Sequence, residues 1–109
     1  MRIWDVEPDR LCRNHLLGEH RELHAIWTIL NEGRKGYSRH PEALRWQGKL
    51  KALYVRHEKL CVEMQMRGFR HNSPLDPELA VGWHLQDEFV DPVAEQLDIL
   101  RKKGCECKV

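Results

Sequence analysis

The sequence predicts an all-α fold: a compact single-domain bundle of about three main helices with an ordered N-terminal segment. Hydrophobic residues recur at helical spacing in three stretches, and no convincing run of the alternating pattern typical of strands is found. At 109 residues the chain is long enough for one hydrophobic core and too short for two. We therefore expect residues 1–109 to form one domain, with residues 104–109 as a flexible tail.

The first predicted helix spans Leu11 to Leu30 and organises the rest of the chain. Before it, Ile3, Trp4 and Val6 are hydrophobic anchors, which should hold the start of the chain in place where termini usually fray. Glu7-Pro8 favours extended backbone, and Asp9 is the expected N-cap. The inward stripe comprises Leu16, Leu23, Ile26, Trp27 and Leu30, and the polar side carries His15, Glu19, Arg21 and Glu22. Gly18 is the weak point of this helix.

A second long helix is predicted from Pro41 to Arg67, after a basic loop over residues 31–41 that is rich in turn residues. Pro41 suits the first helical turn, Gly48 is a point where the helix can bend or divide, and Gly68 suits the left-handed C-terminal position. The hydrophobic stripe of this helix comprises Leu50, Leu53, His57, Leu60, Cys61 and Met64.

The last third of the sequence contains one further good helix. Residues 72–77 form a turn-rich connector, and residues 78–89 lack long periodicity, so we expect a short helix and a loop there. Asp91-Pro92 predicts an N-cap followed by proline at the first helical position. The sequence Lys102-Lys103-Gly104 supplies a cationic last turn and a stop.

Composition narrows the classes of function. The formal net charge of +1 does not mark a general nucleic-acid binder, so an anionic partner would need a local basic patch. The first ten residues carry charges where a signal peptide needs an apolar run, and no stretch approaches the roughly 20 apolar residues of a membrane span. We expect a soluble cytoplasmic protein, not bound to a membrane. Its four cysteines do not form a secreted disulfide framework and should be reduced thiols.

An ordered chain start beside an acidic helix face suggests imine chemistry. An α-amine has an ordinary pKa near 8, so about a tenth of it is neutral at pH 7, whereas a lysine amine is almost wholly protonated. The neutral amine is a nucleophile for carbonyl-like carbon, and Glu19 or Glu22 is positioned to move protons. Every chain has an N-terminus, however, and helix-face glutamates are usually solvated surface.

Several motifs resemble the pyrimidine-dimer DNA glycosylases of the phage endonuclease V type. NHLLGEHREL, residues 14–23, resembles the QHLMAEYREL segment of that family, and LCVEMQMRGFRHN, residues 60–72, resembles a helix end with Arg-Gly-Phe. In the bacterial branch the chain begins MRLW and has a KGYxxHP loop; here residues 1–4 read MRIW, Glu7-Pro8 follows, and residues 35–41 read KGYSRHP. The resemblance covers roughly residues 1 to 75.

This resemblance implies a compact helical repair enzyme that cleaves the glycosidic bond of a damaged pyrimidine, cyclobutane pyrimidine dimers among the candidates, and then nicks the abasic strand by β-elimination. The nucleophile would be the N-terminal amine, here that of Met1, and the essential glutamate of the family falls on Glu22. Arg2, Asn14, His15 and Arg21 fall on positions that approach DNA, and Lys35 and Arg39 of the basic loop would extend the grip on the phosphates. Tyr37 or Trp46 would be a wedge between bases, although packing is the more frequent role of such aromatic residues.

The resemblance further implies double-stranded damaged DNA as the partner of a monomeric enzyme, with no cofactor and no metal. Met1 lies 14 residues before His15, the spacing that the processed amine has from its histidine in phage members. Two departures concern dimer specificity. Ala25 stands where phage members have an arginine, and the chain ends in GCECKV where they have an aromatic, basic tail.

Three other interpretations remain. His15, His20 and His24, with Cys61 or the pair Cys105 and Cys107, are candidate metal ligands, but histidines four and five residues apart do not all share a helix face and C-x-C alone lacks the spacing of a zinc site. A non-catalytic helical module that binds DNA or protein would explain the near-neutral charge. A DNA-binding relic that kept the fold and lost the chemistry is the third.

Overall fold

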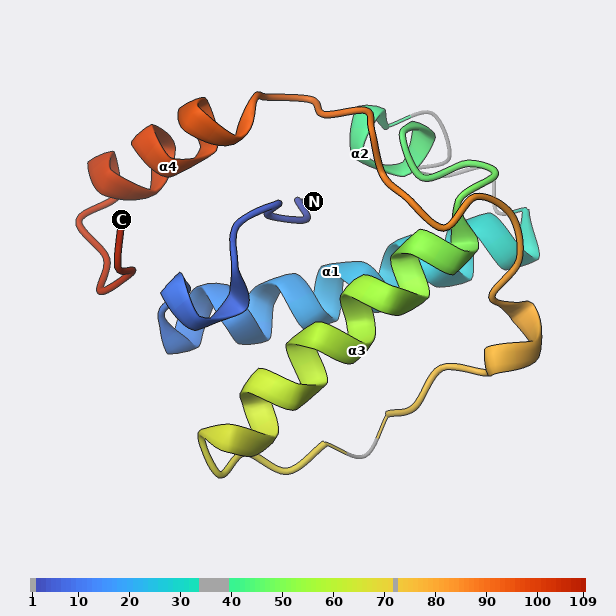
Figure 1. Ribbon diagram of the computed structural model, residues 1–109, viewed down its shortest axis with the longest axis horizontal. Coiled ribbons are helices and arrows are strands. Elements are labelled where there is room, and N and C mark those ends of the chain that lie inside the picture. The colour runs from blue at the N-terminus through green and yellow to red at the C-terminus, as the bar shows by residue number, and fades with distance from the viewer. Residues whose placement is uncertain (1, 34–39, 72) are drawn as a thin grey trace.

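The two longest helices cross the middle of the molecule in opposite directions (Figure 1). They are α1, Arg13–Glu32, and α3, Leu50–Met66, in a computed structural model that describes residues 2–33, 40–71 and 73–109. The described residues contain helices and no strand, as the sequence predicts, and none of their helices is long and apolar enough to cross a membrane. The fold is therefore the expected all-α bundle.

The start of the chain is packed, as its hydrophobic residues predict. Ile3, Trp4 and Val6 are buried, and the short 3-10 helix η1, Pro8–Arg10, connects them to α1. The prediction of Asp9 as N-cap is wrong. Pro8 at the first position tightens the backbone into η1, so that Asp9 lies inside that turn and Cys12 is the N-cap of α1.

The predicted helix over residues 41–67 is divided at Gly48. The first part is α2, Pro41–Leu44, and the second is α3. Gly48 has a φ of 72°, and its carbonyl accepts a hydrogen bond from the N–H of Trp83 at 2.8 Å. A left-handed residue that is bound by a distant part of the chain cannot continue a helix, which explains the break. Pro41 lies in the first turn of α2, as predicted.

The end of α3 is a Schellman motif, which the Arg-Gly-Phe sequence predicts. The N–H of Phe69 donates to the carbonyl of Met64 at 2.9 Å, and the N–H of Gly68 donates to that of Gln65 at 3.0 Å. Gly68 has the left-handed φ of 81° that this motif requires. The chain consequently reverses here and returns along α1 and α3 (Figure 1).

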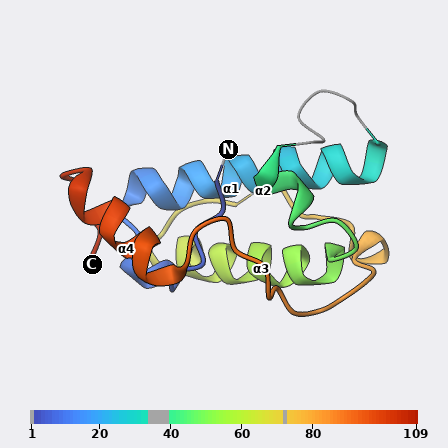
Figure 2. The same cartoon turned by 90° about the horizontal axis from the view of Figure 1, so that it is seen from above.

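The last third of the chain wraps around the two long helices. It contains the 3-10 helix η3, Pro77–Leu79, an irregular segment over residues 80–92, and α4, Val93–Lys102. Helix α4 lies near the beginning of α1 (Figures 1 and 2). The prediction of Asp91 as N-cap is wrong: Pro92 is the N-cap, and the carboxylate of Asp91 is held by Arg2 at 2.9 Å. Gly104, with a φ of 65°, follows the end of α4 as expected.

One hydrophobic core joins the chain start, α1, α3 and α4. The inward residues of α1 and α3 meet there, together with the chain start, Trp46 and Leu100 of α4. Among the described residues no buried side-chain nitrogen or oxygen lacks a hydrogen-bond partner. The flexibility of residues 104–109 stays a prediction, but Cys107 and Val109 pack against this core. The fold thus brings both described ends of the chain to α1.

Candidate active site

Glu19 fastens the start of the chain to α1. Its Oε1 accepts a hydrogen bond from the backbone N–H of Trp4 at 3.0 Å. The guanidinium of Arg56 on α3 donates to both carboxylate oxygens of Glu19, at 2.7 and 3.0 Å. Charged groups are rarely buried unless they are paired, and this pair satisfies a carboxylate that is 2% exposed. The first residues are consequently fixed against one face of α1.

Burial and pairing act on Glu19 in opposite directions. Burial raises the pKa of Glu19, while the charge and hydrogen bonds of Arg56 and the N–H of Trp4 work to lower it. The bidentate geometry is that of a carboxylate held by a guanidinium fork. The sequence suggested Glu19 and Glu22 as proton carriers. The carboxylate of Glu19 is used to hold the chain start.

Glu22 lies on the same side of α1, three residues beyond Glu19, and is partly exposed. Residues three apart on a helix are neighbours on its surface, so the carboxylate of Glu22 stands about one turn along from the anchored chain start. Figures 1 and 2 show the first described residues beside the middle of α1. A partly exposed acid next to a fixed chain start is accessible to a large substrate.

The other expected DNA-contact residues on α1 differ in their surroundings. Asn14 and Arg21 are exposed on its surface. His15 is partly buried: its Nδ1 lies 3.1 Å from the sulfur of Cys12 and 3.3 Å from that of Cys107, and its ring makes an edge contact with Trp4. Only the far edge of the His15 ring is therefore free of these sulfur contacts.

Arg2 reaches away from α1. It forms an ion pair with Asp91 at 2.9 Å, and its guanidinium lies 4.9 Å from the centre of the Trp4 ring. Both side chains of the ion pair are about 30% exposed, so this is a surface pair of small energy. Three further expected site residues, Met1, Lys35 and Arg39, and also Tyr37, lie outside the described residues. Trp46 is buried in packing, the more frequent of its two expected roles.

Sequence reasoning missed two arginines that hold this region together. Arg56 occupies an inward position of α3, three residues after Leu53 and four before Leu60, and a cation on a hydrophobic stripe is a signal that a buried partner exists. Arg45 is 5% exposed and binds Glu42 at 2.6 Å, Asp5 at 3.0 Å and the carbonyl of Ile3 at 3.0 Å. Glu42 is a local partner at i, i+3, but no local pattern indicates that Arg45 also binds Asp5 and Ile3 of the chain start.

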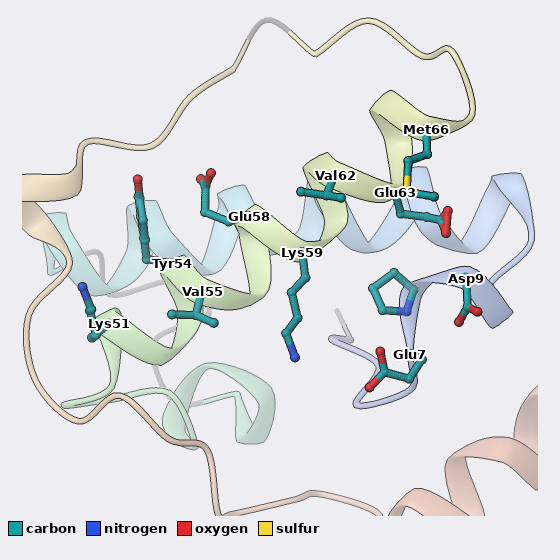
Figure 3. Close-up of a pocket in the computed structure, with 11 residues that line it drawn as sticks. Glu7, Asp9, Lys51, Tyr54, Val55, Glu58, Lys59, Val62, Glu63 and Met66 are labelled. Carbon is teal, nitrogen blue, oxygen red and sulfur yellow. The ribbon is translucent and has the colours of Figure 1, made fainter.

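A pocket of about 570 Å³ lies along the outer face of α3, where residues 7–9 approach that helix (Figure 3). Val55, Val62 and Met66 give it an apolar floor, with Glu58, Lys59 and Glu63 at its edges. None of the residues that the sequence suggested for the active site lines it. The pocket is thus separate from the Glu22 face of α1.

Among the described residues, two groups of side chains lie close enough together to hold a metal ion. One group is Cys12, His15, Cys105 and Cys107; the other is His20, His24, His57 and His71. In each group the four ligand atoms lie within 4.8 Å of one another. The spacing of His15, His20 and His24 disfavours one metal site for all three, because they do not share a face of α1. The structure separates them accordingly, with His15 in the first group and the other two in the second.

The fold and this arrangement define an all-α domain in which an anchored chain start lies beside a partly exposed acidic residue of α1. A family model described as pyrimidine dimer DNA glycosylase matches residues 1–77, and the chain belongs to that family. The resemblance seen in the sequence is thereby confirmed for most of the chain, and residues 78–109 lie beyond the match. No curated protein and no solved structure matches the chain.

Proposed function

We propose that the protein is a DNA glycosylase with abasic-site lyase activity that acts on damaged pyrimidines, cyclobutane dimers among them. The α-amine of Met1 is the nucleophile and Glu22 is the general acid and base. The observation that carries the proposal is the hydrogen bond from Trp4 to Glu19, which fixes the chain three residues after its start to the helix that bears Glu22.

Simple chain geometry supports this assignment. Three residues extend over at most about 10 Å, so the anchored Trp4 limits how far the α-amine lies from Glu19. Glu22 follows Glu19 by a rise of about 4.5 Å along the helix. The anchored Trp4 thus supports an amine and a carboxylate that act on the same nucleotide.

The reaction divides into two steps in which the same two groups act. In the first, the neutral amine attacks C1′ of the sugar, the bond from C1′ to the base breaks, and opening of the ring at O4′ leaves a protonated imine. The base and O4′ each take up a proton, one of which the amine releases. The carboxylate of Glu22 relays these protons and stabilises the positive charge that develops at C1′.

The second step breaks the strand. The imine acidifies the C2′ hydrogen, Glu22 removes it as a proton, and the electrons expel the phosphate oxygen from C3′. Water then adds to C1′ of the imine, which releases the sugar fragment and restores the amine. No cofactor is required, because the imine itself is the electron sink.

Binding of DNA is assigned to the α1 surface around Glu22. Arg21 and Asn14 are exposed there. The far edge of the His15 ring would donate to a phosphate when its Nε2 carries the proton. Arg2 would exchange Asp91 for a phosphate at little cost, since a surface ion pair is worth about 0–1 kcal/mol. Lys35 and Arg39 are proposed to add phosphate contacts. Extruding a nucleotide costs a few kcal/mol and costs least at a damaged site.

Borohydride trapping tests the proposal. The full-length protein, incubated with an oligonucleotide duplex that contains an abasic site or a cyclobutane dimer, should form a covalent complex that survives denaturation. Selective blocking of the α-amine should abolish the complex, and an undamaged duplex should give none. Binding of the damaged duplex without covalent capture would instead identify a non-catalytic DNA-binding module of the same fold.

A further inference from the structure

Four histidines from three parts of the chain direct the same ring atom toward one point. His20 and His24 lie four residues apart on α1, His57 lies on α3, and His71 lies just beyond the end of α3. The Nε2 atom of His24 is 3.2 Å from that of His20 and 3.1 Å from that of His57, and the Nε2 atoms of His71 and His20 are 3.0 Å apart. The contacts form a chain in the order His57, His24, His20, His71.

Hydrogen bonds between the rings cannot account for this arrangement. Each Nε2 has a single in-plane position, which holds either an N–H or a lone pair. His24 and His20 each have two Nε2 neighbours, so at most two of the three contacts can be satisfied at once. When His57 pairs with His24 and His71 pairs with His20, no hydrogen bond joins His24 to His20. One cation at the centre would satisfy all four lone pairs together.

With a Zn–N bond of about 2.05 Å, the nitrogens of a regular tetrahedron lie about 3.3–3.4 Å apart. The three Nε2 separations given above, 3.0, 3.1 and 3.2 Å, are close to that value. The outer nitrogen of His57 lies 3.1 Å from a carboxylate oxygen of Glu58, which is the outer-shell partner that orients a ligating imidazole.

The second group has the chemistry of a structural zinc site. His15 Nδ1 lies 3.1 Å from Cys12 Sγ and 3.3 Å from Cys107 Sγ. The single in-plane position of Nδ1 therefore has two sulfur neighbours, and one hydrogen bond cannot satisfy both. The backbone N–H of Cys12 donates to Cys107 Sγ at 3.1 Å, a bond that orients the sulfur. Cys105 completes the group. Three thiols and one imidazole form a Cys₃His ligand set, which zinc binds with four-coordinate geometry.

We propose that the protein binds two divalent transition-metal ions, with zinc as the ion that suits both sites: one held by His20, His24, His57 and His71, the other by Cys12, His15, Cys105 and Cys107. The two groups share no residue, so each site stands on its own geometry.

The ions fasten two segments that lie outside the helices to the long helices. The histidine site fastens the chain reversal after α3 to both long helices. The cysteine site fastens residues 105–107 to the beginning of α1, beside the hydrogen bond from the N–H of Lys108 to the carbonyl of Arg10 at 2.7 Å. His20 and His24 are each two residues from Glu22 on α1, and such positions do not face each other. The histidine site is therefore structural and separate from the proposed imine chemistry.

Cys61 borders the histidine site without belonging to it. Its sulfur is 3.3 Å from His71 Nε2 and 3.7 Å from His57 Nε2, on one side of the group. This neighbour provides a sharp test, because replacing Cys61 should leave the bound ion in place.

Metal analysis of the full-length protein tests both sites without any assay of repair. After saturation with Zn²⁺ and removal of the excess, the wild type should retain two zinc ions per chain. His71→Ala and Cys107→Ser should each retain one, and the double variant none. Cys61→Ser and His84→Ala, the latter at an exposed histidine outside both groups, should retain two. Loss of zinc in Cys61→Ser would overturn the four-histidine ligand set.

Substitution with Co²⁺ distinguishes the sites from each other. The wild type and His71→Ala should show the near-ultraviolet charge-transfer band of sulfur bound to cobalt, and Cys107→Ser should lack it. Far-ultraviolet circular dichroism checks the fold of each variant; where helicity is lost, His20→Gln and Cys105→Ser remove another ligand of the same site. A wild type that binds no metal would overturn both sites. A variant of a proposed ligand that still binds both ions would overturn the site to which that ligand is assigned.

Discussion

The backbone N–H of Trp4 and the carboxylate of Glu19 lie 3.0 Å apart and join the chain start to α1. Arg56 completes this contact from α3, and its side chain is 12% exposed. Glu19→Gln keeps an acceptor for Trp4 but leaves a buried cation without its counter-charge. We expect the free energy of unfolding to fall by about 3–5 kcal/mol, measured by denaturant titration.

The matched control for that change is Glu95→Gln, which removes an exposed carboxylate from α4. Surface substitutions of this kind usually alter stability by about 0.5 kcal/mol or less. If Glu19→Gln lowered the free energy of unfolding as little as this control does, the anchoring of the chain start would not depend on the ion pair with Arg56.

Glu22→Gln should abolish strand cleavage while the fold and the affinity for DNA stay nearly unchanged. The amide has the shape of the acid but cannot relay protons, and general acid and base catalysis contributes about 10²- to 10⁴-fold to a rate. Single-turnover cleavage of an abasic duplex measures the loss. Full activity in this variant would show that another carboxylate acts, and Glu78→Gln on η3 serves as the control.

Arg21→Ala should weaken DNA binding and reduce its dependence on salt. Removing one phosphate contact lowers the slope of log K against log salt by about 0.9. Fluorescence anisotropy at several salt concentrations gives this slope. Arg101→Ala, an exposed arginine on α4, should leave it unchanged. An equal slope for wild type and Arg21→Ala would remove Arg21 from the interface.

A chelator should lower the melting temperature of the wild type and leave that of the His71→Ala, Cys107→Ser double variant unchanged. An ion that binds only the folded chain stabilises it by about 4 kcal/mol when its free concentration is 1,000 times Kd. Thermal denaturation with and without chelator measures the difference, and added Zn²⁺ should restore the wild type alone. Equal responses of the two proteins would contradict metal-dependent stability.

Gly82→Ala should destabilise the fold more than Gly68→Ala. Both glycines have a left-handed φ, of 88° and 81°, which costs any other residue about 1 kcal/mol or more. A Cβ at Gly82 would in addition lie 2.2 Å from the carbonyl oxygen of Gly48, whereas one at Gly68 meets open space. Denaturant titrations of the two variants give the comparison, and equal losses would show that the backbone yields at Gly82.

Local patterns predicted the elements that depend on local interactions. The stripe of α1 and the Arg-Gly-Phe end of α3 require only neighbours in sequence, and both were predicted correctly. The two N-caps were wrong because other interactions compete for the aspartates. Pro8 draws Asp9 into η1, and Arg2, from the opposite end of the chain, takes Asp91.

The candidate site shows the same division between local and distant contacts. Motifs on α1 predicted the family, which the family match confirms, because those residues are contiguous. The catalytic role of Glu22 stays a prediction. The histidine group escaped the sequence argument since His57 and His71 join His20 and His24 only after α3 packs against α1. Cys105 and Cys107 meet Cys12 and His15 because the end of the chain returns to α1, a contact that no spacing rule reveals.

Gln96 on α4 is 2% exposed, and its side-chain amide joins the family-matched residues 1–77 to the residues that follow them. It accepts from the N–H of Asp5 at 2.8 Å and donates to the Asp5 carboxylate and to the carbonyl of Asp91, each at 2.9 Å. Residues 1–77 therefore depend on contacts from beyond the family match: without α4 the amide of Asp5 would lose this partner and the core would lose Leu100. A shortened chain that keeps these contacts has to retain α4.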